Sequence, residues 1–249
     1  LNAVLEHDET LRTQLTLTEG RPRQYFVPFV PQSFPVLDFS AVTQAEFEAW
    51  QKAVTQTPMP LLDQPLIHFY GFQTGETCGG VLILAHHLIS DGWAQVLLHN
   101  RIAALYCRAQ AGESLEEAEL TPYCEHLSQE QAYQHSSRYT RDQQFWQRET
   151  AAWEAPESLR TTPLYPLSPV GKRYSRILSE SLSRRLQVFC NERQISPFIT
   201  ILLGLAVYLG RIHAQKAPVI GVPVINRSQS KEKYAGGMFV STLSFRCEL

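Results

Sequence analysis

The chain lacks paired cysteines and a strong excess of charge, and both absences narrow its possible functions. Its five cysteines are odd in number and none forms a Cys-x-x-Cys pair, which argues against a disulfide framework and a thiolate metal site. This cysteine usage favours a reducing, cytoplasmic location. The formal net charge is −2 and the basic residues are scattered. We therefore expect no binding to nucleic acid or to an anionic membrane surface.

Long hydrophobic runs and several catalytic motifs are also missing. The longest apolar run, 198–212, contains Thr200 and Arg211 and is shorter than the roughly 18 residues needed to span a bilayer. It predicts a buried helix rather than a membrane span. No His-Glu-x-x-His is present, and Ser90 lacks a Gly-x-Ser-x-Gly context. We expect no bound metal and no serine nucleophile.

The composition and the order of patterns indicate a globular α/β chain. Hydrophobic residues make up 44% and charged residues 18% of the chain, which suits a large core and argues against disorder. Extended segments alternate with helical ones on both sides of a proline-rich stretch. We therefore predict an N-terminal lobe over 1–155, a linker over 156–175 and a C-terminal lobe that begins at 176 and includes 249.

Local signals place several of the expected elements. A hairpin is predicted from 11–15 to 24–27, and a second from 66–72 to 80–84, both across glycine-containing turns. Thr43 followed by Glu46 predicts a helix start with a capping box, and Ser196 before Pro197 predicts another. The remaining expectations are a single polar-rich helix over 128–150, a helix over 181–193, and a strand over 219–222.

The most informative stretch is His86-His87-Leu88-Ile89-Ser90-Asp91-Gly92, where an apolar strand meets a helix. The strand, 81–85, is apolar on both faces and is predicted to be interior. Side chains alternate along a strand, so the two histidines should point to opposite faces, one structural and one open to a cavity. Asp91 stands where a carboxylate can cap the helix or pair with an arginine.

Each of these residues also has a plain structural interpretation. A lone histidine beside an apolar strand is more often a satisfied core residue than a catalytic one, because sites need convergent groups. That interpretation is kept for the other histidines outside the N-terminal motif, namely His68, His99, His126, His135 and His213. Asp91 and Gly92 are equally consistent with a simple helix cap.

Three separated motifs together resemble the condensation domains of nonribosomal peptide synthetases. His86–Gly92 is similar to the His-His-x-x-x-Asp-Gly signature of that family. The segment 7–13, His-Asp-Glu-Thr-Leu-Arg-Thr, resembles its second motif, which usually reads Arg-His-Glu-x-Leu-Arg-Thr. The segments 220–227 and 237–243 resemble its fifth motif. His7, Asp8 and Ser241 depart from the residues usual at their positions, which are arginine, histidine and asparagine.

The resemblance implies a fold like chloramphenicol acetyltransferase, with two α/β lobes in a V and the catalytic histidine in a tunnel. It assigns His87 the catalytic role and His86 that of a buried partner, with Gly92 and Asp91 supporting the motif. Asp91 is expected to face a buried arginine, with Arg227 as the first candidate and Arg12 as the second. Domains of this family extend further at both ends, so the chain is expected to be a truncated portion.

The implied reaction is peptide-bond formation between carrier-bound thioesters. The resemblance implies donor and acceptor peptidyl carrier domains as partners, with a neighbouring adenylation domain. No cofactor is expected to bind this chain directly, because the phosphopantetheine arms belong to the carriers. Two alternatives stay open: a stand-alone acyltransferase that uses coenzyme A thioesters, and a non-catalytic domain on which carrier proteins dock.

Overall fold

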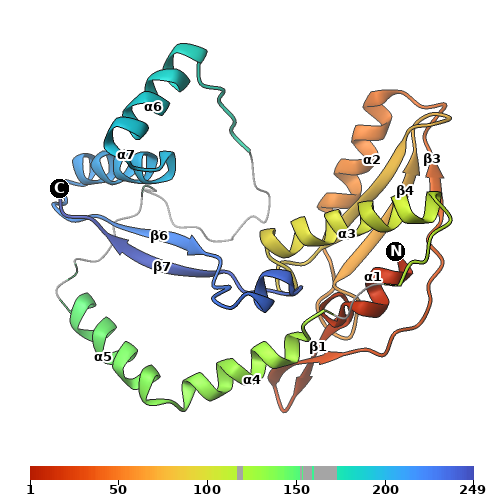
Figure 1. Ribbon diagram of the computed structural model, residues 1–249, viewed down its shortest axis with the longest axis horizontal. Coiled ribbons are helices and arrows are strands. Elements are labelled where there is room, and N and C mark those ends of the chain that lie inside the picture. Colours follow the sequence, from red (N-terminus) through yellow and green to blue (C-terminus); the bar gives the residue numbers. More distant parts are fainter. Residues whose placement is uncertain (117–119, 152, 154–158, 160–172) are drawn as a thin grey trace. The chain divides into compact units, whose positions relative to one another are not determined.

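The computed structural model describes residues 1–116, 120–151, 153, 159 and 173–249 (Figure 1). Its contacts divide the chain into two compact units. The first unit comprises Leu1–Arg141 and Ile225–Ser241, and the second comprises Asp142–Val224 and Thr242–Leu249. The predicted linker, 156–175, lies almost entirely outside the described residues. The predicted division into lobes stays a prediction.

The first unit contains a three-stranded sheet with the order β3-β4-β5. Its strands are β3 (Val36–Asp38), β4 (Ile67–Gln73) and β5 (Gly79–Ala85). β4 and β5 form the predicted antiparallel hairpin, and β3 runs parallel to β4. The expectation of an interior strand is wrong for β5, which is the last strand of this sheet as described and is only half-buried. Apolar residues on both faces indicate that the faces are covered, but they do not show that both edges are paired.

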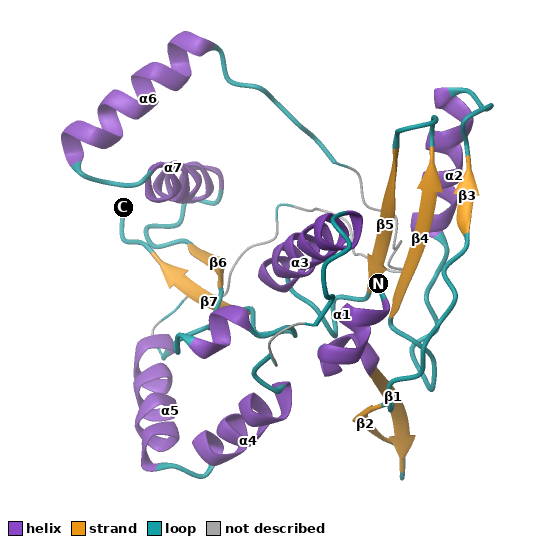
Figure 2. Cartoon of the chain, turned by 45° about the vertical axis from the view of Figure 1, so that its right-hand side comes forward, coloured by secondary structure: helices purple, strands orange, loops and turns teal. Residues whose placement is uncertain are grey.

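Helices cover both faces of this sheet (Figure 2). On one face, α1 (Asn2–His7) and α3 (Gly92–Gln110) supply core residues that pack against β4 and β5. The core contains the buried side chains of Val4, Leu5, Leu11, Leu66, Ile67, Ile89, Leu98 and Leu105. On the other face, α2 (Gln44–Gln56) packs Phe47 against Phe72, with ring centroids 5.1 Å apart. This packing anchors β4, which pairs with β5, the strand that leads directly into the two histidines.

The first predicted hairpin is confirmed as β1 (Thr13–Thr18) paired with β2 (Arg21–Phe26). It follows α1 and the short 3-10 helix η1 (Glu9–Arg12). The predicted start of α2 is also confirmed, since Thr43 and Glu46 form both bonds of a capping box. Sequence patterns of this kind predict the structure correctly because the residues that interact are close neighbours in the sequence.

The single helix expected over 128–150 is instead two helices, α4 (Tyr123–Gln134) and α5 (Ser137–Thr150). His135 and Ser136 separate them, and Ser136 makes the break. Its hydroxyl donates to the Tyr133 carbonyl and accepts from the Tyr139 N–H at 3.2 Å. Serine competes with helical backbone bonds in this way and starts a new helix, so the prediction of one continuous helix is corrected.

The second unit contains α6 (Glu180–Arg193), α7 (Pro197–Ile212), and the paired strands β6 (Val219–Val224) and β7 (Ser241–Arg246). The start of α7 is as predicted, with the Ser196 hydroxyl accepting from the Ile199 N–H at 3.2 Å. Among the described residues, no single helix is long and apolar enough to cross a membrane. Together, α6 and α7 have the length and composition of a membrane span, but they are bent by 101° relative to each other.

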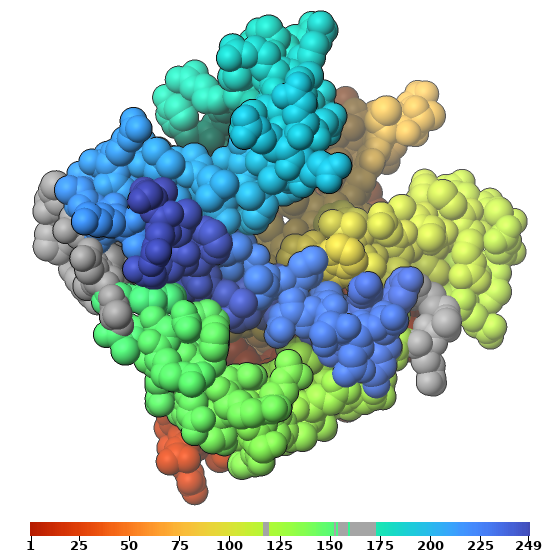
Figure 3. All heavy atoms as spheres, turned by 60° about the vertical axis from the view of Figure 1, so that its left-hand side comes forward, coloured from red at the N-terminus to blue at the C-terminus, as the bar shows by residue number. Residues whose placement is uncertain are grey.

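The expectation that 198–212 forms a buried helix is only half correct. Leu202, Ala206 and Gly210, spaced by four, form the buried stripe of α7. A second stripe is exposed and is made of Phe198, Ile201, Leu205, Tyr208 and Ile212. The atoms of α6 and α7, in cyan and light blue, lie at the surface (Figure 3). A helix that is apolar on most faces needs cover on each of them.

We expect a polypeptide of residues 1–249 to self-associate through this exposed stripe, because exposed apolar patches of this kind drive association. The double substitution Ile201→Lys and Leu205→Lys should shift it toward the monomer in analytical ultracentrifugation. Gln187→Lys, at an exposed position of α6, is the control for added charge alone. A wild-type polypeptide that sediments as a monomer at micromolar concentration would contradict this prediction.

Candidate active site

The two histidines lie on a turn that follows β5, not on the strand itself. The His86 N–H donates to the Leu66 carbonyl at 2.8 Å and continues the ladder by one residue. The Ile89 N–H then donates to the His86 carbonyl at 3.1 Å and closes a tight turn. Strand alternation therefore does not determine the directions of the two histidines, since Ala85 is the last strand residue. The geometry of the turn sets their directions.

His86 fixes this turn from within. Its Nδ1 accepts a hydrogen bond from the Leu88 N–H at 3.1 Å, so a neutral His86 ring carries its proton on Nε2. The ring is half-buried, whereas the sequence predicted a buried partner. The predicted structural role is consistent with the Leu88 bond.

His87 is the exposed member of the pair. It follows directly on His86, so the bond that fixes His86 also limits where His87 can lie. Gly92 is the first residue of α3, and a Cβ placed on it would meet no heavy atom within 4 Å. Packing within the described residues therefore does not require glycine there.

Asp91 is the most constrained polar residue of the motif, with 1% of its surface exposed. Its Oδ1 caps α3 by accepting from the Ala94 N–H at 2.8 Å. Its Oδ2 accepts from the N–H groups of Phe239 at 2.9 Å and Val240 at 3.2 Å. The carboxylate thus joins the start of α3 to a segment about 150 residues away in sequence. The cap that the sequence predicted is present.

The buried arginine expected opposite Asp91 is Arg227. Its Nη2 lies 3.2 Å from Asp91 Oδ1, and both side chains are almost fully buried. Its Nη1 donates to the carbonyls of Glu232 and Ala235 at 2.5 and 2.6 Å. Burial lowers the pKa of Arg227, and the charge of Asp91 opposes that shift. The guanidinium therefore organises its own loop while it neutralises Asp91.

Arg12, the second candidate, has a different role. Its guanidinium donates to the carbonyls of Leu5, Val27 and Glu6 at 2.8, 2.7 and 3.3 Å. It thereby ties the end of α1 to the end of β2. The alternative pairing of Asp91 with Arg12 is wrong, because backbone carbonyls take up all of its bonds that the structure gives.

A second buried carboxylate, Asp8, was not singled out as a site residue. It accepts from the Thr10 N–H at 3.1 Å and from the Thr10 hydroxyl at 2.5 Å, and it pairs with Arg101 Nη1 at 3.2 Å. A Cβ on Gly236 would lie 2.6 Å from its Oδ2. Asp8 therefore joins η1 to α3 and to the loop that carries Arg227. The only sign in the sequence that position 8 is unusual was that Asp8 stands where the family usually has histidine.

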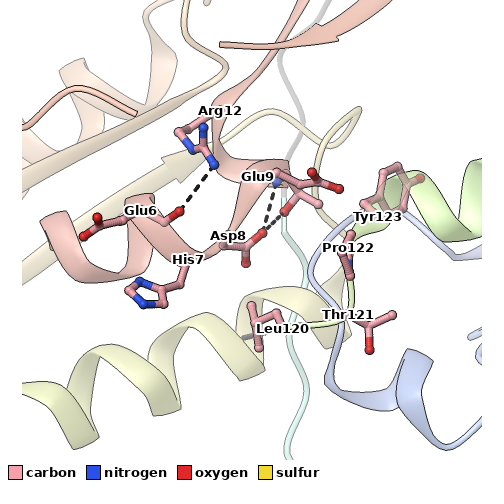
Figure 4. Close-up of a pocket in the computed structure, with 10 residues that line it drawn as sticks. Glu6, His7, Asp8, Glu9, Arg12, Leu120, Thr121, Pro122 and Tyr123 are labelled. Carbon is pink, nitrogen blue, oxygen red and sulfur yellow. Dashed lines mark hydrogen bonds between the residues drawn. The ribbon is translucent and has the colours of Figure 1, made fainter. Parts of the chain in front are cut away.

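Asp8 also lines a cavity of about 400 Å³, formed by residues 6–10, 12 and 120–123 (Figure 4). Burial raises the pKa of Asp8, and the bonds from Thr10 and the charge of Arg101 offset part of that rise. The folded protein therefore holds the Asp8 proton more tightly than the unfolded chain does. Its contribution to stability is fully present below the unfolded pKa and is lost as the pH rises through the folded pKa.

We expect the stability of the wild type relative to Asp8→Asn to fall as the pH rises from about 4. Asparagine keeps an acceptor for Thr10 but has no proton to lose. Urea unfolding at a series of pH values measures the difference. Asp38→Asn is the control, because hydrogen bonds from Ser40 lower the pKa of Asp38. The wild-type advantage over this control should grow as the pH rises to about 4 and stay level above it. A wild-type advantage in stability over Asp8→Asn that grows with pH would contradict the raised pKa of Asp8.

Comparison with known proteins identifies the family. A family model described as Condensation domain matches residues 1–249. The chain belongs to this family. It is 30% identical over 248 residues to surfactin synthase subunit 1 of Bacillus subtilis (strain 168), a match that covers 98% of the chain and 7% of that protein. It is 26% identical over 251 residues to cyclosporin synthetase simA of Tolypocladium inflatum, a match that covers 99% of the chain and 2% of that protein.

Solved structures agree on the fold. The first condensation domain of the calcium-dependent antibiotic synthetase superimposes with a TM-score of 0.83 at 24% identity, over 100% of this chain and 58% of that one. A variant of the starter condensation domain of rhizomide synthetase RzmA, in complex with C8-CoA and Leu-SNAC, gives 0.78 at 25% identity, over 99% and 55%. The predicted α/β, chloramphenicol acetyltransferase-like fold class is thus confirmed. The chain spans less than two thirds of each of these relatives and neighbours.

Proposed function

We propose that this chain is the catalytic condensation domain of a nonribosomal peptide synthetase. It would join a carrier-bound aminoacyl or peptidyl thioester to a carrier-bound aminoacyl acceptor. One observation carries the proposal: His87 is exposed on a turn that is fixed on both sides, by His86 before it and by the buried Asp91–Arg227 pair after it. Membership of the condensation family over the whole chain supports it.

The reaction requires an amine nucleophile that has lost its proton. An α-amine has a pKa of about 8, so much of it is charged near neutral pH. The neutral amine attacks the thioester carbonyl carbon, and a tetrahedral intermediate forms. The C–S bond then breaks, the amide remains, and the thiol of the donor phosphopantetheine arm leaves with a proton.

His87 would act on the proton that the amine loses as the C–N bond forms. An imidazole is suited to accept and return a proton near neutral pH. Hydrogen bonding to the amine or to the tetrahedral intermediate is a second way in which it would lower the barrier. His86, Asp91 and Gly92 would support this role by shaping the turn and the start of α3.

The partners follow from the reaction. Donor and acceptor peptidyl carrier domains would present the thioesters on phosphopantetheine arms, and an adenylation domain of the same synthetase would load a carrier. This chain itself would hold no cofactor. We also propose a cytoplasmic location, since all five cysteines are free thiols in the structure and such usage suits a reducing compartment.

A second candidate keeps the acyl transfer but changes the donor. The rhizomide starter domain, 25% identical to this chain, was solved with C8-CoA and Leu-SNAC. That observation favours a fatty-acyl coenzyme A thioester as the alternative donor here, as in a stand-alone acyltransferase or a starter domain. The two candidates share the His87 chemistry and differ only in what carries the donor acyl group.

The test supplies the intact synthetase with defined donors and a loaded acceptor carrier. Donor-loaded carrier is used in one arm and C8-CoA in the other, and products on the acceptor are measured by mass spectrometry after a single turnover. Amide product from the carrier arm supports the proposal, and product from the C8-CoA arm alone supports the second candidate. No product in either arm, from protein whose carriers are shown to be loaded, contradicts both and favours a docking domain.

A further inference from the structure

Helix α4 contacts the segment 225–241, which carries Arg227 and Phe239 and is called here the arginine loop. The Tyr123 hydroxyl donates to the Met238 carbonyl at 2.8 Å. Further along the helix, the Gln229 side chain donates to Gln129 at 2.9 Å, and Lys231 pairs with Glu125. Both α4 and the arginine loop belong to the first unit. The helix therefore contacts the loop along its length rather than at one point.

Phe239 is contacted by the Arg227 guanidinium and by two rings of α4, those of His126 and Tyr123, the latter edge-on with centroids 5.4 Å apart. The Arg227 guanidinium carbon lies 4.0 Å from the centroid of its ring, within the range of a strong cation–π contact. The His126 ring of α4 lies 4.2 Å away, centroid to centroid, and is tilted by 37°. Phe239 is itself 3% exposed. His126 therefore fills a position that would otherwise be a void beside a buried ring.

Phe239 connects this contact to the histidine motif. Its N–H donates to Asp91 Oδ2 at 2.9 Å, and the Val240 N–H donates to the same oxygen at 3.2 Å. A shift of the Phe239 ring would move these two donors and the Arg227 guanidinium together. All three hold Asp91, which caps α3 one turn after His87.

His126 has a second contact that acts on the same loop. Its Nδ1 lies 3.7 Å from Glu232 Oε1, and both side chains are nearly buried. Glu232 in turn accepts from the Gln229 N–H at 2.8 Å, while its carbonyl accepts from Arg227. At 3.7 Å this contact is longer than a hydrogen bond.

The first turn of α4 is itself anchored. The residue before the helix is Pro122, which offers no side-chain cap. The Glu9 carboxylate of η1 takes that place and accepts from the Cys124 N–H at 3.0 Å. A carboxylate at a helix N-terminus satisfies a free N–H and is favoured by the helix dipole. His126 is thus presented by a turn that is fixed from outside the helix.

We propose that His126 is a positioning residue for condensation, which acts through the Phe239 ring to hold Asp91 and thereby the turn that carries His87. This inference rests on the proposed function for its effect on rate. Its structural part is independent of that function, because the protection of the Phe239 and Val240 amides can be measured without any substrate.

The experiment compares His126→Ala, His126→Phe and the wild type in the intact synthetase. His126→Ala removes the ring and should lower the single-turnover rate at saturating loaded carriers by about 10-fold or more, since small misplacements of reacting groups have large effects. The carrier concentration at half-maximal rate should not change. His126→Phe keeps a ring against Phe239 and should retain the wild-type rate. His135→Ala, an exposed position at the end of α4, is the matched control.

Hydrogen exchange provides the second measurement. The amides of Phe239 and Val240 should exchange faster in His126→Ala and at the wild-type rate in His126→Phe. Unchanged exchange and rate in His126→Ala would overturn the proposal, and so would an equal loss in both variants, because the ring contact would then not be the cause. A wild-type synthetase without condensation activity would contradict the proposed function, while the exchange measurement would still decide the role of His126.

Discussion

A His87→Ala variant of the intact synthetase should lose condensation activity by about 100-fold or more, which is the scale of a lost acid–base group. Its fold should survive, because His87 is exposed and its side chain forms no hydrogen bond or ion pair with the described residues. The measurement is single-turnover amide formation between loaded donor and acceptor carriers. Unfolding in urea should show the same midpoint as the wild type.

The matched control for this prediction is His99→Ala. His99 is also exposed, and its Nδ1 lies 2.6 Å from the Gln95 carbonyl of its own helix. It should condense at the wild-type rate. His86→Ala should behave differently again, because it removes the acceptor of the Leu88 N–H and should lower the unfolding midpoint. Folded His87→Ala with a normal single-turnover rate would show that His87 has no part in the chemistry.

Sequence patterns predicted the fold where the deciding contacts are local. The Thr43 capping box and the turn between β4 and β5 depend on neighbours a few residues away, and both are present. The errors come from contacts that periodicity does not encode. Ser136 ends one helix and starts another through its own hydroxyl, and α7 is apolar on two faces but buried on only one.

In the candidate site, too, some contacts could be predicted from the sequence and others could not. The Asp91–Arg227 pair could be anticipated because a buried carboxylate needs a cationic partner and the family resemblance pointed to Arg227. Asp8 and His126 could not be found in this way. Their contacts with Arg101 and Phe239 join residues far apart in sequence. The sequence distinguished Asp8 only by its departure from the usual histidine, and it did not distinguish His126 at all. Only the packing of α3, α4 and the arginine loop brings these residues together.

Asp91→Asn should be the most destabilising single change in the motif, by about 3–5 kcal/mol, because it leaves the Arg227 charge buried without its partner. The amide also has the wrong hydrogen-bonding pattern. Both Asp91 oxygens accept, one from Ala94 and Arg227 and the other mainly from the N–H groups of Phe239 and Val240. Whichever way the asparagine turns, its NH₂ group faces donors. Urea unfolding of the folded domain measures the loss.

Two comparisons make this prediction decisive. Asp38→Asn changes an exposed carboxylate that accepts from the Ser40 N–H at 2.8 Å, and it should leave the unfolding midpoint close to that of the wild type. The double variant Asp91→Asn with Arg227→Met should recover part of the loss, because the stranded charge is then absent and the remaining cost is that of the lost backbone bonds. Equal midpoints for Asp91→Asn and the wild type would mean that the pair does not hold α3 to the arginine loop. A double variant whose loss equals the sum of the two single losses would mean that the Arg227 bonds to Glu232 and Ala235, rather than the ion pair, dominate.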